Sequence, residues 1–228
     1  MYKVSGWQFD DSVTDIFDDH VNQSVPLYGD IQNIVANISD FFIDTNCPIY
    51  DLGCSTGETI SKINLRHFDK NLKFIGIDES LPMLNKAKEK TYLVKNINLV
   101  NSKIEDYTFK EKTNLIISIL TLHFLPVGER KKVISNIYNA LNEGGAFLLV
   151  EKTYPQNVQC NDIFTQLYHD FKETKGLTAL EIRDKDKSLR SKLIPLSLDE
   201  NIKILQDQGF KTDIFFKYLN FVGIICLK

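Results

Sequence analysis

The sequence predicts an α/β fold in which a mostly parallel β-sheet is covered by helices on both faces. Short apolar runs alternate with amphipathic helical stretches from residue 48 onward. Their strand-helix-strand order and spacing are typical of βαβ units, which build parallel sheets. The last two apolar runs are separated only by the three residues "KYL", so they are predicted to form a hairpin. One strand is therefore expected to run antiparallel to the rest.

Seven apolar runs are rich in Ile, Val, Leu and Phe and are short enough to be strands. They span residues 48–52, 73–78, 97–100, 114–119, 145–152, 211–216 and 220–227. Three stretches with helical spacing of apolar residues lie between them, at 57–68, 80–92 and 129–142. "NEGG" at 142–145 is expected to end the last of these helices.

Length and composition indicate one globular domain over residues 1–228. The chain has 43% hydrophobic and 25% charged residues, which is typical of a globular protein. Its net charge of -3 argues against direct nucleic-acid binding. No signal peptide and no apolar run approaching about 18 residues is found, so no membrane contact is expected. The four cysteines form no zinc motif, which predicts a cytoplasmic protein without a metal: Cys47, Cys54, Cys160 and Cys226.

Two segments lie outside the βαβ pattern. Residues 8–45 are predicted to form a helical cap, with Val13, Ile16, Phe17 and Val21 at helical spacing before a break at Pro26. Residues 155–200 are predicted to be a helical insertion, either a static cap or a lid over a cleft at the carboxyl ends of the strands. The charge run "EIRDKDKSLRSK" within the insertion is interpreted as a solvated helix face.

The stretch "YDLGCSTGET" at 50–59 predicts a loop that binds a nucleotide-type cofactor. Gly53 and Gly57 allow close backbone approach at a strand-to-helix turn, but their spacing does not fit a dinucleotide fingerprint. Asp51 would repel a pyrophosphate and suits an ammonium group. Asp78, 25 residues after Gly53, ends the second strand and can accept both hydroxyls of a ribose. S-adenosylmethionine (SAM) carries both an ammonium group and a ribose.

Four motifs in order resemble those of class I SAM-dependent methyltransferases: "YDLGCSTGET", "FIGIDES", "LTLHFLP" and "LNEGGAFLLVEK". The resemblance implies a Rossmann-like seven-stranded sheet with the last strand inserted antiparallel. It also implies SAM as cofactor, with S-adenosylhomocysteine (SAH) as the product of methyl transfer.

A narrower resemblance, to the carboxy-SAM synthase family, covers nearly the whole chain. It is carried by "GWQFDDSVTDIF", "SVPLYGDI", "YHDFK", "LEI" and "LNFVGIICLK". The resemblance implies conversion of SAM to carboxy-SAM with prephenate as carboxyl donor, in a pathway that modifies a tRNA wobble uridine. It further implies a homodimer that does not itself bind the tRNA. SAM contacts are implied at Tyr28, Gly53, Cys54, Ser55, Asp78 and Glu79.

Three positions depart from that family. Lys103, followed by Ile104, stands where the family has an acid beside the adenine, and Ile119 stands where it has an asparagine. An ungapped match places Asp186, between Lys185 and Lys187, where the family has an arginine that pairs with the extra carboxylate of carboxy-SAM. Loss of such a charge-assisted pair costs about 1.5–3 kcal/mol. A neighbouring lysine could substitute only as a point charge.

The candidate catalytic residues are His123, His169 and Tyr168. Either histidine could remove a proton from an acceptor, with Tyr168 or Tyr28 as an orienting hydroxyl, or could have a structural role only. Cys54 is interpreted as a small turn residue. The phenylalanines Phe109, Phe124, Phe215 and Phe216 are interpreted as core.

Three functions remain open. The first hypothesis is a SAM-dependent methyltransferase that acts on an unidentified small molecule. The second is a carboxy-SAM synthase that tolerates Asp186. The third is a SAM-binding protein without catalysis.

Overall fold

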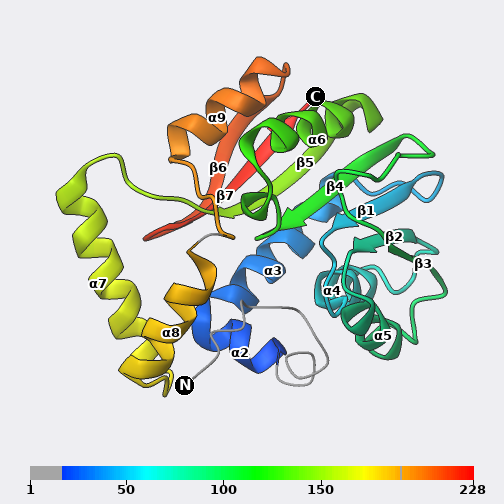
Figure 1. Cartoon of the computed structure of the whole chain (residues 1–228). Helices are drawn as coiled ribbons and strands as arrows, with labels where there is room; N and C mark the ends of the chain where they lie inside the picture. Colours follow the sequence, from blue (N-terminus) through cyan, green and yellow to red (C-terminus); the bar gives the residue numbers. More distant parts are fainter. Residues whose placement is uncertain (1–16, 191) are drawn as a thin grey trace.

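A computed structural model describes residues 17–190 and 192–228. They form one seven-stranded sheet with the order β3-β2-β1-β4-β5-β7-β6 (Figure 1). The strands are β1 Pro48–Leu52, β2 Lys73–Asp78, β3 Asn96–Asn101, β4 Thr113–Ile119, β5 Leu141–Lys152, β6 Lys211–Tyr218 and β7 Phe221–Leu227. The predicted Rossmann-like methyltransferase fold is confirmed.

The antiparallel strand of the sheet is β7. It pairs antiparallel with both β5 and β6, whereas β1 to β5 pair in parallel. The hairpin turn is Leu219–Asn220, which is shorter than the predicted connection because β6 extends to Tyr218. The inserted last strand is therefore as expected.

Helices cover both faces of the sheet, as the alternation of side chains along β1 requires. Tyr50 and Leu52 pack in one core cluster with α6 Val127–Ala140 and α9 Leu198–Asp207. Ile49 packs in the other cluster with α3 Tyr28–Ile38, α4 Glu58–Arg66 and α5 Leu81–Lys90. This period-two division is what a strand buried on both faces produces.

The boundary between α6 and β5 differs from the prediction. The helix ends at Ala140, and β5 begins at once at Leu141, so the "NEGG" stretch is part of the strand rather than a helix stop. The register between β4 and β5 shifts there, between the pairs of Thr113 and Leu115. The glycines therefore accommodate an irregularity in the strand.

The N-terminal cap consists of α2 Phe17–Ser24 and α3, separated at Pro26 as predicted. Val13 and Ile16 lie outside the described residues. The insertion between β5 and β6 contains α7 Val158–Thr174 and α8 Ala179–Leu189, and α9 begins at its end. In Figure 1, α7 and α8 extend to one side of the sheet, beyond α2. Within the described residues, no helix is both long and apolar enough to cross a membrane.

Candidate cofactor site

A cavity of about 690 Å³ opens where the carboxyl ends of β1, β2, β3 and β4 meet. This volume is in the usual range for a small-molecule site. Ten of the predicted cofactor residues lie on its wall: Tyr28, Asp51, Gly53, Cys54, Ser55, Asp78, Glu79, Lys103, Ile104 and Ile119. The tertiary structure therefore brings together residues from five separate segments of the chain.

The loop after β1 is folded tightly by its glycines. Gly53 has a φ of 76°, and a Cβ there would lie 2.2 Å from Oγ1 of Thr121. The backbone amides of Gly53 and Cys54 both donate to the carbonyl of Ile77 on β2. Gly57 also has a φ of 76° and forms the N-cap of α4, behind the wall of the cavity. Gly57 thus shapes the loop without lining the cavity.

Asp78 is held in position by two backbone amides. Its Oδ2 accepts a hydrogen bond from the amide of Ser55, and its Oδ1 accepts one from the amide of Ser80, each at 2.9 Å. Burial nevertheless raises the pKa of this carboxyl, more than these amides lower it. Each carboxylate oxygen keeps a second lone pair that a ligand hydroxyl could use.

Asp51 is a buried acid at the floor of the cavity, with 3% of its surface exposed. Burial, and secondarily the charge of Asp78, raises its pKa to about 7. Burial and then the charge of Asp51 also raise the pKa of Tyr28. This pair of acids makes the cavity favourable for a cation, which would relieve the cost of ionising Asp51.

The end of β4 forms a strained wall. Leu120 adopts a φ of 56° although it has a side chain, and its amide donates to the carbonyl of Val150 at 2.8 Å. Thr121 follows and packs on Gly53. Non-glycine residues in this conformation often cluster at functional sites. Ile119, Leu120 and Thr121 all line the cavity.

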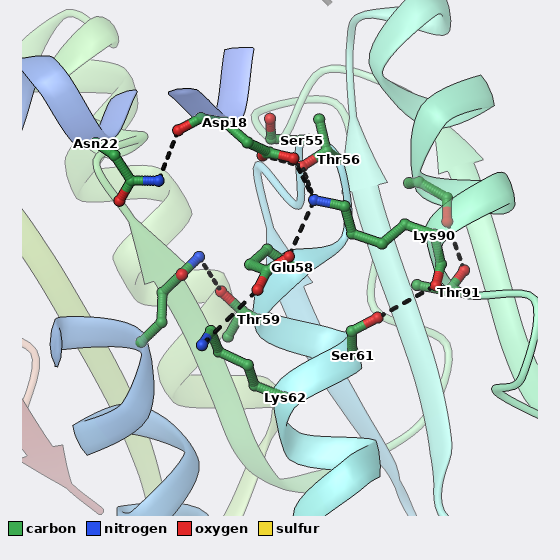
Figure 2. Close-up of polar contacts among 12 residues, drawn as sticks. Asp18, Asn22, Ser55, Thr56, Glu58, Thr59, Ser61, Lys62, Lys90 and Thr91 are labelled. Carbon is green, nitrogen blue, oxygen red and sulfur yellow. Dashed lines mark hydrogen bonds and ion pairs between the residues drawn. The ribbon is translucent and has the colours of Figure 1, made fainter. Parts of the chain in front are cut away.

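Helix α2 closes one side of the cavity through Phe17 and Val21. It is tied to α4 and α5 by a polar network around Asp18, which Figure 2 shows. Oγ1 of Thr56 donates to Asp18 at 2.8 Å, and Lys90 forms ion pairs with both Asp18 and Glu58. These contacts fix α2 beside the glycine loop.

A buried arginine that was not singled out from the sequence connects the segment after β4 to the segment after α8. Arg130 is 1% exposed and donates to the carbonyls of Leu122, Leu125 and Ile194. The amide of Ile194 in turn donates to the carbonyl of His123 at 2.8 Å. Arg130 therefore holds the segment after α8, which contributes Lys192 and Ile194 to the cavity, against the segment after β4.

The three candidate catalytic residues do not line the cavity. His123 is 3% exposed, its Nδ1 lies 3.5 Å from Glu151, and burial lowers its pKa to about 3. The hydroxyl of Tyr168 donates to the carbonyl of Ser24 at 2.7 Å. His169 pairs with Asp186. The expected place of His123 beside an acceptor is therefore corrected, because its ring packs behind the wall.

Asp186 does not line the cavity either. Its carboxylate is 2.9 Å from Nε2 of His169 and 3.2 Å from Nζ of Lys172, both on α7. The expectation that Asp186 faces the sulfonium side is therefore not met. The charge run on α8 is divided: Arg183, Asp184 and Lys187 are exposed, but Lys185 and Asp186 are half-buried against neighbouring helices.

One interpretation of the aromatic residues is also corrected. Phe109, Phe215 and Phe216 pack against the core, as predicted, but Phe124 lines the cavity. Sequence reasoning further missed three wall residues on helices whose cavity-facing side could not be known, Gln32, Thr59 and Met83, and one in the turn after α8, Lys192. Only the interpretation of residues 155–200 as a lid pointed towards Lys192.

Comparison with known proteins supports a SAM-dependent transferase. A family model described as "Methyltransferase domain" matches residues 49–145. A putative O-methyltransferase from Nostoc punctiforme has a similar structure, with a TM-score of 0.68 and 12% identity. The match covers 96% of this chain and 59% of that one. Human N-acetylserotonin methyltransferase, solved in complex with SAM, gives 0.63 at 16% identity, over 96% and 56% of the two chains.

Similarity in sequence extends over the whole chain. A carboxy-S-adenosyl-L-methionine synthase from Staphylococcus epidermidis is 41% identical, and the match covers 100% of this chain and 99% of that one. A synthase of the same name from Methylococcus capsulatus is 35% identical, over 96% and 93% of the two chains. These matches include the N-terminal cap and the insertion, which the methyltransferase model leaves out. The chain belongs to the carboxy-S-adenosyl-L-methionine synthase family.

Proposed function

We propose that this protein converts SAM to carboxy-SAM, with prephenate as the carboxyl donor. The observation that carries the proposal is the 41% identity to a carboxy-SAM synthase over the full chain, insertion included. The solved methyltransferases compared above match the fold over 96% of this chain, but at only 12% and 16% identity. The proposal favours the second hypothesis from sequence, carboxy-SAM synthesis, over the first, methyl transfer to a small molecule.

SAM is proposed to lie along the carboxyl edge of the sheet. Its ammonium group would be held near Asp51, and its ribose hydroxyls would reach the Asp78 carboxylate, which Ser55 and Ser80 hold in place. The adenine would lie between the glycine loop and Ile104, with Lys103 at the rim. The sulfonium would then face Leu120, Thr121 and α2, away from bulk water.

The proposed reaction supplies its own proton acceptor. Prephenate loses CO2 and its ring hydroxyl and becomes phenylpyruvate. The methyl carbon of SAM loses a proton and forms a bond to the carbon of that CO2. The proton and the released hydroxide together make water, so atoms and charges balance. No protein base is needed, which agrees with the absence of histidine among the described cavity residues.

The substitution at position 186 is compatible with this function. The Asp186 carboxylate forms an ion pair with Lys172 at 3.2 Å and a hydrogen bond with His169 at 2.9 Å. It therefore adds little repulsion at the sulfonium side. The loss of the family arginine and the apolar Ile119 still favour a second candidate, methyl transfer to a small acceptor. The two candidates leave different nucleosides behind.

The test is incubation of the purified protein with SAM and prephenate, followed by mass spectrometry of the nucleosides. We expect a product heavier than SAM by one CO2 and an equal amount of phenylpyruvate. Asp78→Asn is the inactive control, and Asp69→Asn, an exposed acid outside the cavity, should behave as wild type. Formation of SAH with no carboxy-SAM would overturn the proposal in favour of methyl transfer.

The protein is further proposed to be a homodimer. Helix α7 buries only Tyr168 and Lys172 among its 17 residues, while Val158, Ile163 and Leu167 are exposed. A helix with such a narrow buried stripe leaves apolar surface that a second copy could cover. The resemblance to the carboxy-SAM synthase family implies such a dimer.

A further inference from the structure

Three lysines from three separate elements meet beside the cofactor cavity. Lys152 ends β5, Lys172 lies on α7 and Lys185 lies on α8. The ammonium groups of Lys152 and Lys172 lie 4.6 and 4.2 Å from the centre of the Tyr168 ring. We call these three residues the lysine cluster.

Among the described residues, one carboxylate, that of Asp186, lies among the three ammonium groups. Asp186 accepts from Lys172 at 3.2 Å and is also bound by His169. Lys152 contacts the Tyr168 ring, and no carboxylate of the described residues lies within ion-pair distance of its ammonium group. Lys185 donates to Oγ of Ser24 at 2.9 Å and to His20. Counted over the described residues, the lysine cluster therefore has more positive than negative charge.

This excess charge is held in a poorly hydrated place. Lys172 is 2% exposed, and Lys152 and Lys185 are half-buried. Burial, followed by the charge of Lys172, lowers the pKa of Lys152 to about 8, against the opposing effect of Asp186. Burial and the charges of Lys172 and Lys152 lower that of Lys185 to about 7. An anion bound there would offset this cost.

The lysine cluster adjoins the wall of the cavity. Helix α2 presents Phe17 and Val21 to the cavity, and His20 and Ser24 to Lys185. Lys152 follows Val150 by two residues, and Val150 pairs with Ile119 of the cavity wall. The two sites thus share α2 and the carboxyl edge of β4 and β5.

We propose that the lysine cluster binds a carboxylate of an anionic second substrate, a dicarboxylate, next to SAM. This inference rests on the proposed function, in which the donor carries two carboxylates. Lys152 would contact the substrate directly. Lys172 would be held by Asp186 and would contribute charge from behind, and Lys185 would contribute from α8. Point charges from three elements would replace the planar fork of an arginine.

The test measures dicarboxylate binding without turnover. Protein loaded with SAH, which has no methyl group to react, is titrated by calorimetry with prephenate and separately with malonate. Lys152→Met should weaken binding at least tenfold, because the side chain keeps its length and loses its charge. Lys187→Met, an exposed lysine on α8, is the matched control and should stay within twofold of wild type. Equal affinity of SAH for all variants shows that each one is folded.

A second variant is expected to strengthen dicarboxylate binding rather than weaken it. Asp186→Asn removes the carboxylate that neutralises the lysine cluster, so it should bind the dicarboxylates more tightly than wild type. If Lys152→Met binds them as wild type does, or if wild type binds neither of them, the anion site is wrong. If wild type makes no carboxy-SAM but binds malonate in a Lys152-dependent way, the site stands and the proposed function falls. If the protein makes carboxy-SAM but its dicarboxylate binding does not depend on Lys152, the proposed function stands and the anion site is wrong.

Discussion

At the scale of single residues, two acids on the wall of the cavity are assigned to the proposed cofactor site: Asp51, which is buried, and Asp78, which is half-buried. Asp78 accepts two backbone amides at 2.9 Å, which hold it where a ribose would lie. Asp51 is buried at the floor of the cavity with its pKa raised to about 7. Asp78 is positioned by hydrogen bonds, whereas the pKa of Asp51 is set mainly by burial. The two residues should therefore respond differently to mutation and to pH.

Asp78→Asn should weaken SAM binding by about 2–4 kcal/mol, because the charge-assisted bonds to two hydroxyls are lost and one carboxylate oxygen is replaced by an NH2 group that cannot accept a hydrogen bond. Titration calorimetry with SAM on wild type and variant measures this directly. Asp69→Asn serves as the control, since its side chain is exposed and does not line the cavity. Unchanged affinity in Asp78→Asn would contradict the assignment of this residue to the ribose.

SAM affinity should depend on pH through Asp51. The ammonium group of SAM requires the carboxylate form, but below pH 7 the Asp51 carboxyl of the free protein is protonated. Binding must then release a proton, so affinity falls by up to about tenfold per pH unit below 7 and levels off above it. Calorimetry between pH 5.5 and 8.5 tests this. Asp51→Asn should bind more weakly with a flatter profile, and a flat wild-type profile would refute the role.

The raised pKa of Asp51 should make SAM affinity rise with pH but should make the stability of the fold fall with pH. For Asp51 and Glu151, whose pKa burial raises to about 8, the folded state binds protons that the unfolded state has released. Their contribution to stability is fully present below about pH 4, falls progressively as the pH rises, and is lost once the pH passes about 7 to 8. A cofactor whose cation pairs with Asp51 should restore part of it, which thermal unfolding with and without SAH would show.

At the scale of elements, α2 is held beside the cavity by the network of Asp18, Thr56, Glu58 and Lys90 (Figure 2). Lys90→Met removes two ion pairs and the donor to Thr56. We expect faster amide hydrogen exchange in α2 and a loss of about 1 kcal/mol or less in SAM affinity, because these pairs are partly exposed. Lys88→Met, an exposed lysine on the same helix, should change neither quantity. Unchanged exchange in both variants would show that apolar packing alone holds α2.

The insertion is expected to respond to ligand as a lid. Lys192 and Ile194 line the cavity, whereas α7 and α8 contact the remainder of the chain over a narrow stripe. Addition of SAM should therefore slow hydrogen exchange in residues 155–200 and leave the central strands nearly unchanged. Equal exchange with and without SAM would indicate a static cap.

At the scale of the whole molecule, the exposed apolar residues of α7 bear on assembly. Ile163 and Leu167 are 49% and 46% exposed and lie one helical turn apart. If a second copy covers them, Leu167→Arg should shift light scattering at tens of micromolar from a dimer to a monomer, and Gln166→Arg on the neighbouring face should shift it less. A monomeric wild type would refute the dimer.

The sheet could be predicted from sequence because its signals are local. β1 and β2 have the predicted bounds, since each is an apolar run with an acid at its last or next-to-last position. Gly53, Asp51 and Asp78 could be assigned to a common site for a topological reason: the carboxyl ends of parallel strands meet at one edge. The family could also be recognised, because its motifs occur in order along the chain.

The direction of side chains on helices, by contrast, was decided by tertiary packing. His123 directly precedes the cavity residue Phe124, yet its ring does not line the cavity and lies 3.5 Å from Glu151. Asp186 was expected at the sulfonium side, yet it points to Lys172 and His169 on α7. Arg130, Lys152 and Lys192 acquired their roles only when segments far apart in the chain met. Periodicity specifies which residues share a face of a helix, but the partner of that face depends on how the helices dock. The sequence by itself therefore determined the fold and the position of the candidate cofactor loop, and the tertiary structure decided which charged side chains meet beside them.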